Sequence, residues 1–169
     1  LYNGGLTVHS TINLEIQKQL ETAFSNNATF TGNTSSKNIP QASGIVIDYK
    51  GHILGVVGGR GKKEGNRVLN RATQTSRSPG STIKPLAVYT PQIERNLINW
   101  STILKDSPIT ITEKGKSKLW PNNYDRKYYG SMNVNTAVQR SINTIPVKLT
   151  QSLTPKVGFD FLVEKLGFT

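Results

Sequence analysis

Residues 77–85 read Arg77-Ser-Pro-Gly-Ser-Thr-Ile-Lys-Pro85, and the proline that ends this stretch indicates where a helix begins. Proline is tolerated in the first turn of a helix, where its missing N–H would have no partner, but it breaks a helix interior. We therefore predict a helix from Ser81 to about Asn96, whose first stretch Pro91 kinks or ends. Ser81 and Lys84, three positions apart, then lie on one face of that helix.

Ser81 and Lys84 in this arrangement are a candidate nucleophile and general base. A serine hydroxyl is a poor nucleophile until a nearby base removes its proton. A lysine can be that base only when its pKa falls towards neutrality, and both burial and the positive end of a helix dipole lower it. The backbone N–H of Ser81 at the helix start is a candidate oxyanion donor. Ser-x-x-Lys alone is more often a solvated helix start, so its neighbours must decide.

A second candidate element, Ser141 and Asn143, follows later in the chain. As an isolated tripeptide, Ser-Ile-Asn is typical of a helix end or a turn. Its surroundings are more specific, and they comprise Pro121-Asn-Asn-Tyr-Asp125, Tyr129-Gly130, Thr136-Ala-Val-Gln-Arg-Ser-Ile-Asn143 and Pro146-Val147.

Taken in order, these segments resemble the transpeptidase domain of the class A penicillin-binding proteins, whose superfamily carries Ser-x-x-Lys, Ser-x-Asn and Lys-Thr-Gly elements. The resemblance covers essentially the whole chain. It also includes Gly5-Leu-Thr-Val-His-Ser-Thr-Ile-Asn13 with Gln17, the stretch from Gly44 to Gly59, the run from Arg67 to Ala72, and Val88-Tyr89.

The resemblance implies a role for each motif residue. Ser81 would be the acylated nucleophile and Lys84 its base. Ser141 would relay a proton between Lys84 and the substrate amine, while Asn143 would bind the substrate amide and help hold Lys84. The implied activity is serine D,D-transpeptidation of peptidoglycan stem peptides, with β-lactams as covalent inhibitors and with no metal or organic cofactor.

The third element, Lys-Thr/Ser-Gly, is absent, because Lys114-Gly-Lys-Ser-Lys118 has the wrong order and position. We therefore expect residues 1–169 to be the N-terminal portion of a transpeptidase domain, inactive until a C-terminal half, possibly a second chain, completes it. Class A relatives lie on the extracytoplasmic face of a bacterial membrane and carry an anchor and an upstream glycosyltransferase domain. Neither lies within this sequence, which has no apolar run of about 20 residues.

The order of the elements predicts an α+β fold. The resemblance implies the penicillin-binding/β-lactamase-like form of it, an antiparallel sheet flanked by helices, of which this chain would be the first half. We expect Pro85 and Pro146 to mark helix boundaries or interruptions. The remaining expectations are a strand from Gly5 to Thr11, a helix from Leu14 to about Phe24 capped by Asn13, a loop from Ser25 to Pro40, a hairpin of Ser43–Asp48 and His52–Val57, loop and short extended segments from Asn96 to Lys118, a loop from Pro121 to Gly130, a helical region from Asn135 to Leu149, and a short helix from Gly158 to Lys165.

Composition excludes several other classes of site. The chain has no cysteine, which removes cysteine nucleophiles and cysteine zinc sites. We expect His9 and His52 to be ordinary surface or turn residues, which leaves no histidine to act as the base of a Ser-His-Asp triad. The net charge of +11 favours attraction to an anionic surface, such as nucleic acid, lipid headgroups or wall polymers. The basic run from Arg60 to Arg77 lacks the aromatics that stack on bases, so we expect a solvated basic face and no nucleic-acid partner. Gly61-Lys62 does not complete a phosphate-binding loop.

Three other functions remain open. A β-lactam-sensing receptor would acylate and signal without turnover. A D,D-carboxypeptidase or β-lactamase would share the acyl-enzyme but hydrolyse it. A basic domain that binds polyanions would carry Ser-x-x-Lys by accident and would not be labelled by penicillin.

Overall fold

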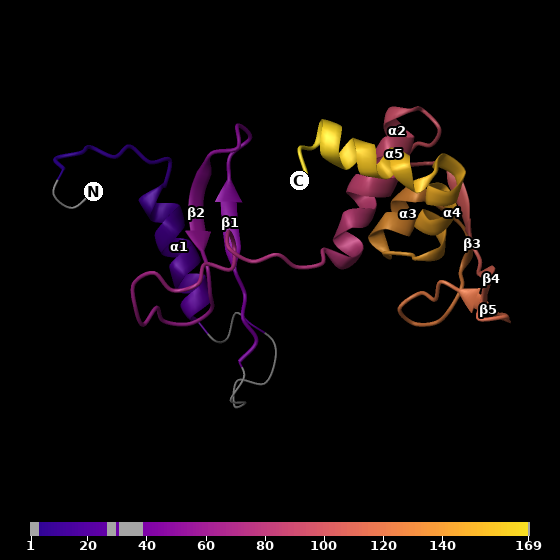
Figure 1. The fold of residues 1–169 in the computed structure, drawn as a ribbon, viewed down its shortest axis with the longest axis horizontal. Coiled ribbons are helices and arrows are strands. Elements are labelled where there is room, and N and C mark those ends of the chain that lie inside the picture. The colour runs from indigo at the N-terminus through magenta and orange to yellow at the C-terminus, as the bar shows by residue number, and fades with distance from the viewer. Residues whose placement is uncertain (1–3, 27–29, 31–38, 169) are drawn as a thin grey trace. The chain divides into compact units, whose positions relative to one another are not determined.

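The computed structural model describes residues 4–26, 30 and 39–168, which fall into two compact units, Leu1–Arg77 and Ser78–Thr169 (Figure 1). Both units combine helices with antiparallel strands, so the predicted α+β class is confirmed. Within the described ranges the strands form three separate two-stranded pairs instead of one sheet. None of the helices described is long and apolar enough to span a membrane.

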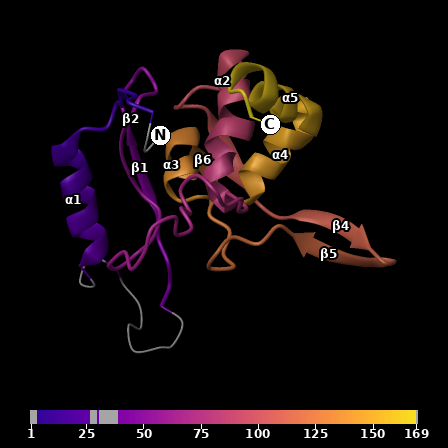
Figure 2. The ribbon, with the colours of Figure 1, turned by 60° about the vertical axis from the view of Figure 1, so that its left-hand side comes forward.

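In the first unit, helix α1 (Leu14–Ser25) starts where the sequence predicts it. The Asn13 side chain accepts hydrogen bonds from the backbone N–H groups of Glu15 (3.0 Å) and Ile16 (3.2 Å), two of the donors that a helix start leaves unpaired. Gln17 then ties α1 to the neighbouring strand, since its side chain bonds both the N–H and the carbonyl of Val56. Figure 2 shows α1 lying beside the two strands of this unit.

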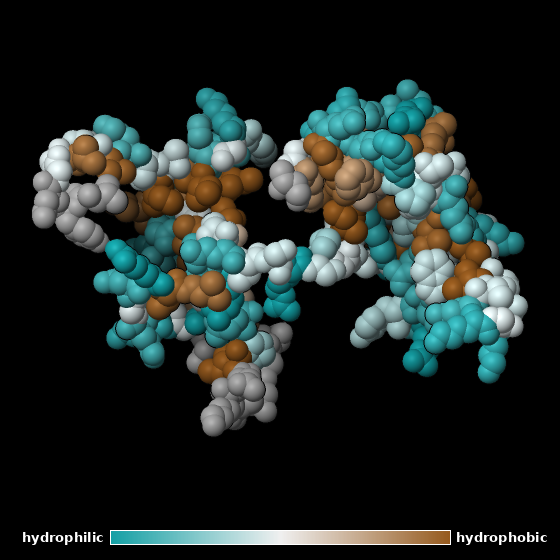
Figure 3. Space-filling model, in the orientation of Figure 1, coloured by the Kyte–Doolittle hydropathy of each residue, from teal (hydrophilic) through white to brown (hydrophobic). Residues whose placement is uncertain are grey.

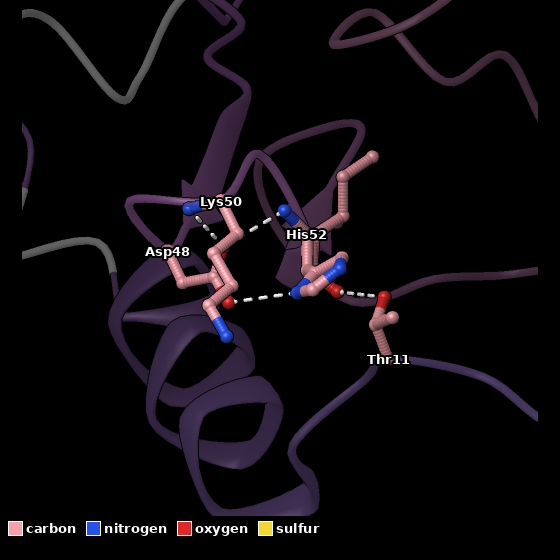
Figure 4. Close-up of polar contacts among 5 residues, drawn as sticks. Thr11, Asp48, Lys50 and His52 are labelled. Carbon is pink, nitrogen blue, oxygen red and sulfur yellow. Dashed lines mark hydrogen bonds and ion pairs between the residues drawn. The ribbon is translucent and has the colours of Figure 1, made fainter.

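The predicted hairpin is also confirmed, as β1 (Gly44–Ile47) and β2 (Ile53–Val57). Its turn is organised by Asp48, which accepts from the backbone N–H of Lys50 (2.8 Å) and of His52 (2.9 Å) and contacts the His52 ring (Figure 4). These bonds, above all the one from the His52 backbone, lower the pKa of the Asp48 carboxyl. His52 is therefore a turn residue, as expected, and His9 is exposed.

The strand predicted from Gly5 to Thr11 is wrong, because these residues form no ladder. At the end of this stretch the Thr11 hydroxyl donates to the Ile53 carbonyl (2.7 Å), and just after it the Asn13 N–H donates to the Leu54 carbonyl (2.8 Å). Alternating β-branched residues favour extended backbone, but a strand also needs a partner along its length. The loop predicted from Ser25 to Pro40 lies mostly outside the described residues.

In the second unit, one continuous helix runs from Gly80 to Glu94. It comprises η2 (Gly80–Thr82), the π-helical turn η3 (Pro85–Tyr89) and α2 (Thr90–Glu94), so the predicted start and approximate end are confirmed. Pro91 does not end the helix. The π turn before it, closed by the Thr90 N–H on the Pro85 carbonyl, widens the backbone where a proline ring would otherwise clash.

The segment predicted as mostly loop, from Asn96 to Lys118, contains more strand than expected. β3 (Ile103–Asp106) pairs with β6 (Gly130–Asn133), and β4 (Ile109–Glu113) pairs with β5 (Lys116–Trp120). Figure 2 shows the β4–β5 hairpin projecting from the helices of its own unit. The loop predicted from Pro121 to Gly130 is confirmed up to Tyr129.

The interruption predicted at Pro146 is wrong, and the helical region breaks at residues 140–143 instead. It divides into α3 (Val134–Gln139) and α4 (Thr144–Leu153), with Pro146 in the first turn of α4, where no N–H is required. The last predicted helix is present, as α5 (Pro155–Asp160) and η4 (Phe161–Lys165), and begins three residues early.

The core of the second unit packs the long helix against α3 and α4. Its buried apolar side chains are Tyr89, Ile98, Val134, Ala137, Ile142, Ile145 and Leu149. Apolar surface is also visible on both units in Figure 3. The core places the start of the long helix beside the break between α3 and α4, where all four predicted site residues lie.

Candidate active site

Ser81 lies in the first turn of the long helix, and its side chain is exposed. The chain enters this turn through Gly80 at φ 57°, a left-handed conformation that favours glycine. The Thr82 hydroxyl donates to the Pro79 carbonyl at 2.6 Å and fixes the entry. The backbone N–H of Ser81 is thus at a helix start, where orphan donors collect.

Lys84 joins the two predicted motifs. Its Nζ donates to the Ser141 carbonyl (2.9 Å), the Ile142 carbonyl (3.1 Å) and Asn143 Oδ1 (2.5 Å), and it lies 3.2 Å from Ser141 Oγ. The structure therefore brings together three of the four predicted site residues, from segments 57 to 59 positions apart.

The helix break makes these carbonyls available. Ser141 has φ 52°, a left-handed conformation that costs a non-glycine residue about 1–3 kcal/mol. Its N–H bonds the Val138 carbonyl, and the Ile142 N–H bonds the Ala137 carbonyl, which closes α3. Because the chain turns here, the carbonyls of Ser141 and Ile142 point to Lys84 instead of continuing a helix.

Asn143 is held on all sides. Its backbone N–H donates to Asn123 Oδ1 (2.8 Å), and its Nδ2 donates to the Asn122 carbonyl (2.7 Å). With Nδ2 committed to the loop, Oδ1 is the atom that faces Lys84. The Asn-Asn pair of the predicted 121–130 loop is therefore a support for Asn143.

Asp106 is a site-supporting residue that sequence reasoning missed. It is 1% exposed, and its carboxylate accepts from Asn123 Nδ2 (2.9 Å), the Tyr129 N–H (2.8 Å) and the Thr144 hydroxyl (2.5 Å). It thus fixes both the loop that holds Asn143 and the first residue of α4. The three donors come from positions 17 to 38 residues away, and no short-range pattern in the sequence marks them.

Two opposing effects act on the Lys84 amine. Partial burial lowers its pKa from the ordinary value, because desolvation disfavours the charged form. The three carbonyl oxygens around Nζ act in the other direction, since together they can accept all three protons of an ammonium. The net direction is a lowered pKa.

Ser81 does not bond Lys84 directly. Among the described residues, the hydrogen-bond partners of Lys84 Nζ all lie between 141 and 143. Ser81, Lys84 and Ser141 instead line one small hollow of about 40 Å³, together with Pro85, Tyr89, Ala137 and Val138. A larger hollow of about 230 Å³ lies between the long helix, α4 and α5, but it is apolar and none of the four residues lines it.

Comparison with known proteins gives a consistent match. Residues 23–168 match the family described as "Penicillin binding protein transpeptidase domain". Penicillin-binding protein 1A of Clostridium acetobutylicum is 35% identical over an alignment of 181 residues, gaps included, that covers 100% of this chain and 22% of that protein. Penicillin-binding protein 1B of Vibrio cholerae is 32% identical over 165 residues, covering 98% and 20%. The chain thus spans about a fifth of the length of these relatives.

Solved structures agree. The crystal structure of penicillin-binding protein 1A from Haemophilus influenzae matches 70% of this chain and 17% of that one, with a TM-score of 0.58 and 34% identity. Penicillin-binding protein PonA1 from Mycobacterium tuberculosis matches 96% of this chain and 39% of that one, with a TM-score of 0.73; at 22% identity it shows the fold alone.

Proposed function

The chain belongs to the penicillin-binding protein transpeptidase family, and from this we propose that it carries the nucleophile and general base of a serine D,D-transpeptidase acting on peptidoglycan stem peptides. The observation that carries the proposal is the bonding of Lys84 Nζ to the 141–143 turn. These hydrogen bonds bring the Ser-x-x-Lys and Ser-x-Asn motifs together in one half-buried site. A Ser-x-x-Lys that occurred by accident on a solvated helix would have no reason to contact the second motif.

In the proposed first step, Ser81 Oγ attacks the carbonyl carbon of the penultimate D-alanine while the hydroxyl proton passes to the Lys84 amine. The helix-start N–H of Ser81 stabilises the oxyanion that forms. The amide C–N bond then breaks, and Lys84 returns the proton through Ser141 to the leaving nitrogen of D-alanine. Asn143 keeps Lys84 in place through Oδ1 and offers the substrate the Nδ2 proton that does not bond the Asn122 carbonyl.

In the second step, an amine from a neighbouring stem peptide attacks the acyl-Ser81 carbonyl. Its proton passes along the same groups in reverse, the ester C–O bond breaks, and Ser81 regains its hydroxyl. A β-lactam enters by the first step and stays bound as an acyl-serine. The chemistry moves only protons and an acyl group, so the proposed residues need no metal or organic cofactor.

The proposed setting is the extracytoplasmic face of a bacterial membrane, where the substrate lies. The named relatives are penicillin-binding proteins 1A and 1B, and the chain matches about a fifth of their length. We infer that residues 1–169 form the N-terminal part of the transpeptidase domain, and that a further segment supplies the Lys-Thr/Ser-Gly element.

The test is intact-mass measurement of the full-length protein after exposure to benzylpenicillin. One added penicilloyl mass is expected for wild type and none for Ser81→Ala. Ser117→Ala is the matched control, since Ser117 is an exposed serine on β5 of the same unit. An adduct that persists in Ser81→Ala rejects the assignment. Cross-linked product from paired stem peptides separates transpeptidation from the carboxypeptidase, β-lactamase and receptor alternatives.

A further inference from the structure

Arg140 is an exposed cation beside the proposed active site that the proposed mechanism does not use. It directly precedes Ser141, whose carbonyl and hydroxyl both contact Lys84 Nζ. Its guanidinium forms no ion pair with any residue that the structure describes. Because a guanidinium presents a rigid fork of donors that matches a carboxylate, an unpaired arginine beside reactive groups is a candidate for binding an anionic part of the substrate.

The side chain of Arg140 is oriented by Tyr129. The guanidinium carbon lies 5.1 Å from the centroid of the Tyr129 ring, within the range of a cation–π contact. Tyr129 is itself held at two points, since its backbone N–H donates to Asp106 Oδ2 (2.8 Å) and its hydroxyl donates to Asp125. A guanidinium stacked on a fixed ring loses less freedom on binding than one that moves in solvent, so Arg140 is pre-organised for a ligand.

Asp125, the acidic side chain of the same loop, does not neutralise Arg140. Its carboxylate accepts hydrogen bonds from the Tyr129 hydroxyl and from the Lys127 backbone N–H (3.1 Å). These bonds, above all the one from Tyr129, lower the pKa of the Asp125 carboxyl, and the same bond raises the pKa of Tyr129. Tyr129 therefore binds the carboxylate at its hydroxyl and the guanidinium over its ring, and the donors of Arg140 stay open to a ligand.

Arg140 lies within reach of a peptide bound at Asn143. Both residues belong to the helix break at residues 140–143, and three residues of backbone span at most about 10–11 Å. An extended peptide advances about 3.3 Å per residue, so a substrate group two or three residues from the amide that Asn143 binds lies at this range. In a stem peptide joined through the γ-carboxyl of D-glutamate, the free α-carboxylate lies two residues before the penultimate D-alanine. Its position and its charge both fit the Arg140 guanidinium.

We propose that Arg140, stacked on the Tyr129 ring, binds a carboxylate of the stem peptide on the acyl side of the scissile bond, and that it selects peptides in which this group is free over those in which it is amidated. The inference rests on the proposed function and adds a specificity determinant to it. The guanidinium donates to the carboxylate and helps to align the scissile carbonyl with Ser81. An amidated group carries no charge and offers one acceptor oxygen in place of two, so its hydrogen bonds to arginine are weaker.

The test gives the full-length protein two peptides, N-acetyl-γ-D-glutamyl-L-lysyl-D-alanyl-D-alanine with its glutamyl α-carboxyl free, and the same peptide with that group amidated. The readout is kcat/KM for release of D-alanine, divided by the rate at which benzylpenicillin acylates the same variant. Benzylpenicillin has no such carboxylate, so a general disturbance of the site cancels. Wild type should favour the free acid at least about tenfold, and Arg140→Gln should abolish this preference. Arg95→Gln, which removes an exposed arginine at the far end of the long helix, should keep it.

Three results overturn the inference. Equal kcat/KM for the two peptides in wild type means that no group distinguishes the carboxylate, and a preference that survives in Arg140→Gln means that another group does. An equal loss for both peptides in Arg140→Gln means that Arg140 only supports the turn. If wild type reacts with benzylpenicillin but releases D-alanine from neither peptide, the proposed function fails. If both peptides react without a preference, only the role of Arg140 fails.

Discussion

Replacing Asp106 by alanine and by asparagine should separate the hydrogen bonding of the buried carboxylate from its charge. In Asp106→Ala, the Tyr129 N–H, the Thr144 hydroxyl and one N–H of Asn123 Nδ2 lose their acceptor, while the other Nδ2 proton keeps the Lys127 carbonyl at 2.7 Å. The two buried donors, the Asn123 amide and the Thr144 hydroxyl, at about 1–3 kcal/mol each give a loss of about 2–6 kcal/mol. Since a whole domain is stable by about 5–15 kcal/mol, this is a severe local change.

Asp106→Asn should be much milder. The amide oxygen can take the place of Oδ2 and accept from Tyr129 and Asn123, and the amide NH₂ can donate to the Thr144 hydroxyl, which rotates to accept. Only the charge assistance of the bonds is lost, so we expect a cost of about 1–2 kcal/mol.

Hydrogen exchange of the Tyr129 amide in the full-length protein measures this loss locally. A loss of 2 kcal/mol or more lowers its protection by about 30-fold or more in Asp106→Ala, with slower penicillin acylation because the Asn123–Asn143 support relaxes. Asp160→Asn is the control, since among the residues that the structure describes that carboxylate pairs only with Lys156 on the surface. Unchanged Tyr129 protection in Asp106→Ala, or equal loss in both Asp106 variants, would refute the reasoning.

Three further outcomes follow from single contacts. Gly158→Ala places a Cβ 2.4 Å from the Ala87 carbonyl oxygen, so it should cost about 1–3 kcal/mol and lower Tm even though alanine favours a helix. Gly65→Ala is the control, because its Cβ meets Val68 Cγ1 at an ordinary 3.8 Å. Equal Tm values for the two variants would contradict the close packing at Gly158. Asn13→Ala should cost about 0.5–2 kcal/mol and speed amide exchange at Glu15 and Ile16, whereas Asn13→Ser, which keeps a capping oxygen, should not. Equal exchange rates in the two variants would show that the Asn13 side chain does not cap the helix. Burial raises the pKa of Tyr89 to about 12, above its unfolded value near 10, so the stability it contributes is complete below pH 10 and is lost as pH rises to 12. Phenolate absorbance should show one tyrosine titrating last, absent in Tyr89→Phe; no such tyrosine means that the ring is not buried.

The parts of the fold that the sequence predicted correctly depend on neighbours in the chain. The Asn13 cap, the hairpin around Asp48 and the helix start at Ser81 each follow from a few consecutive residues. The proline rule worked at Pro85 but not at Pro146. Pro146 lies in the first turn of α4, whereas Pro85 is the first residue of η3, one turn into the long helix. The helical pattern around Pro146 extends to both sides and concealed the break at residues 140–143.

The parts that the sequence did not predict depend on distant partners. β3 pairs with β6 across the intervening β4–β5 hairpin, and nothing local indicates that pairing. The four site residues were found through a resemblance, but the arrangement that holds them was not. Asp106 reads as an ordinary strand-end acid, and only the folded chain shows it bonded to Asn123, Tyr129 and Thr144.

The base assignment is tested most directly by Lys84→Ala in the full-length protein, with peptide mapping to identify the acylated residue. General-base catalysis contributes about 10²–10⁴-fold, so the rate of Ser81 acylation by benzylpenicillin should fall by at least that lower factor while Tyr129 amide protection remains. Wild-type acylation of Ser81 in Lys84→Ala would contradict the account, because the amine held by Ser141 and Asn143 would then have no part in activating the serine.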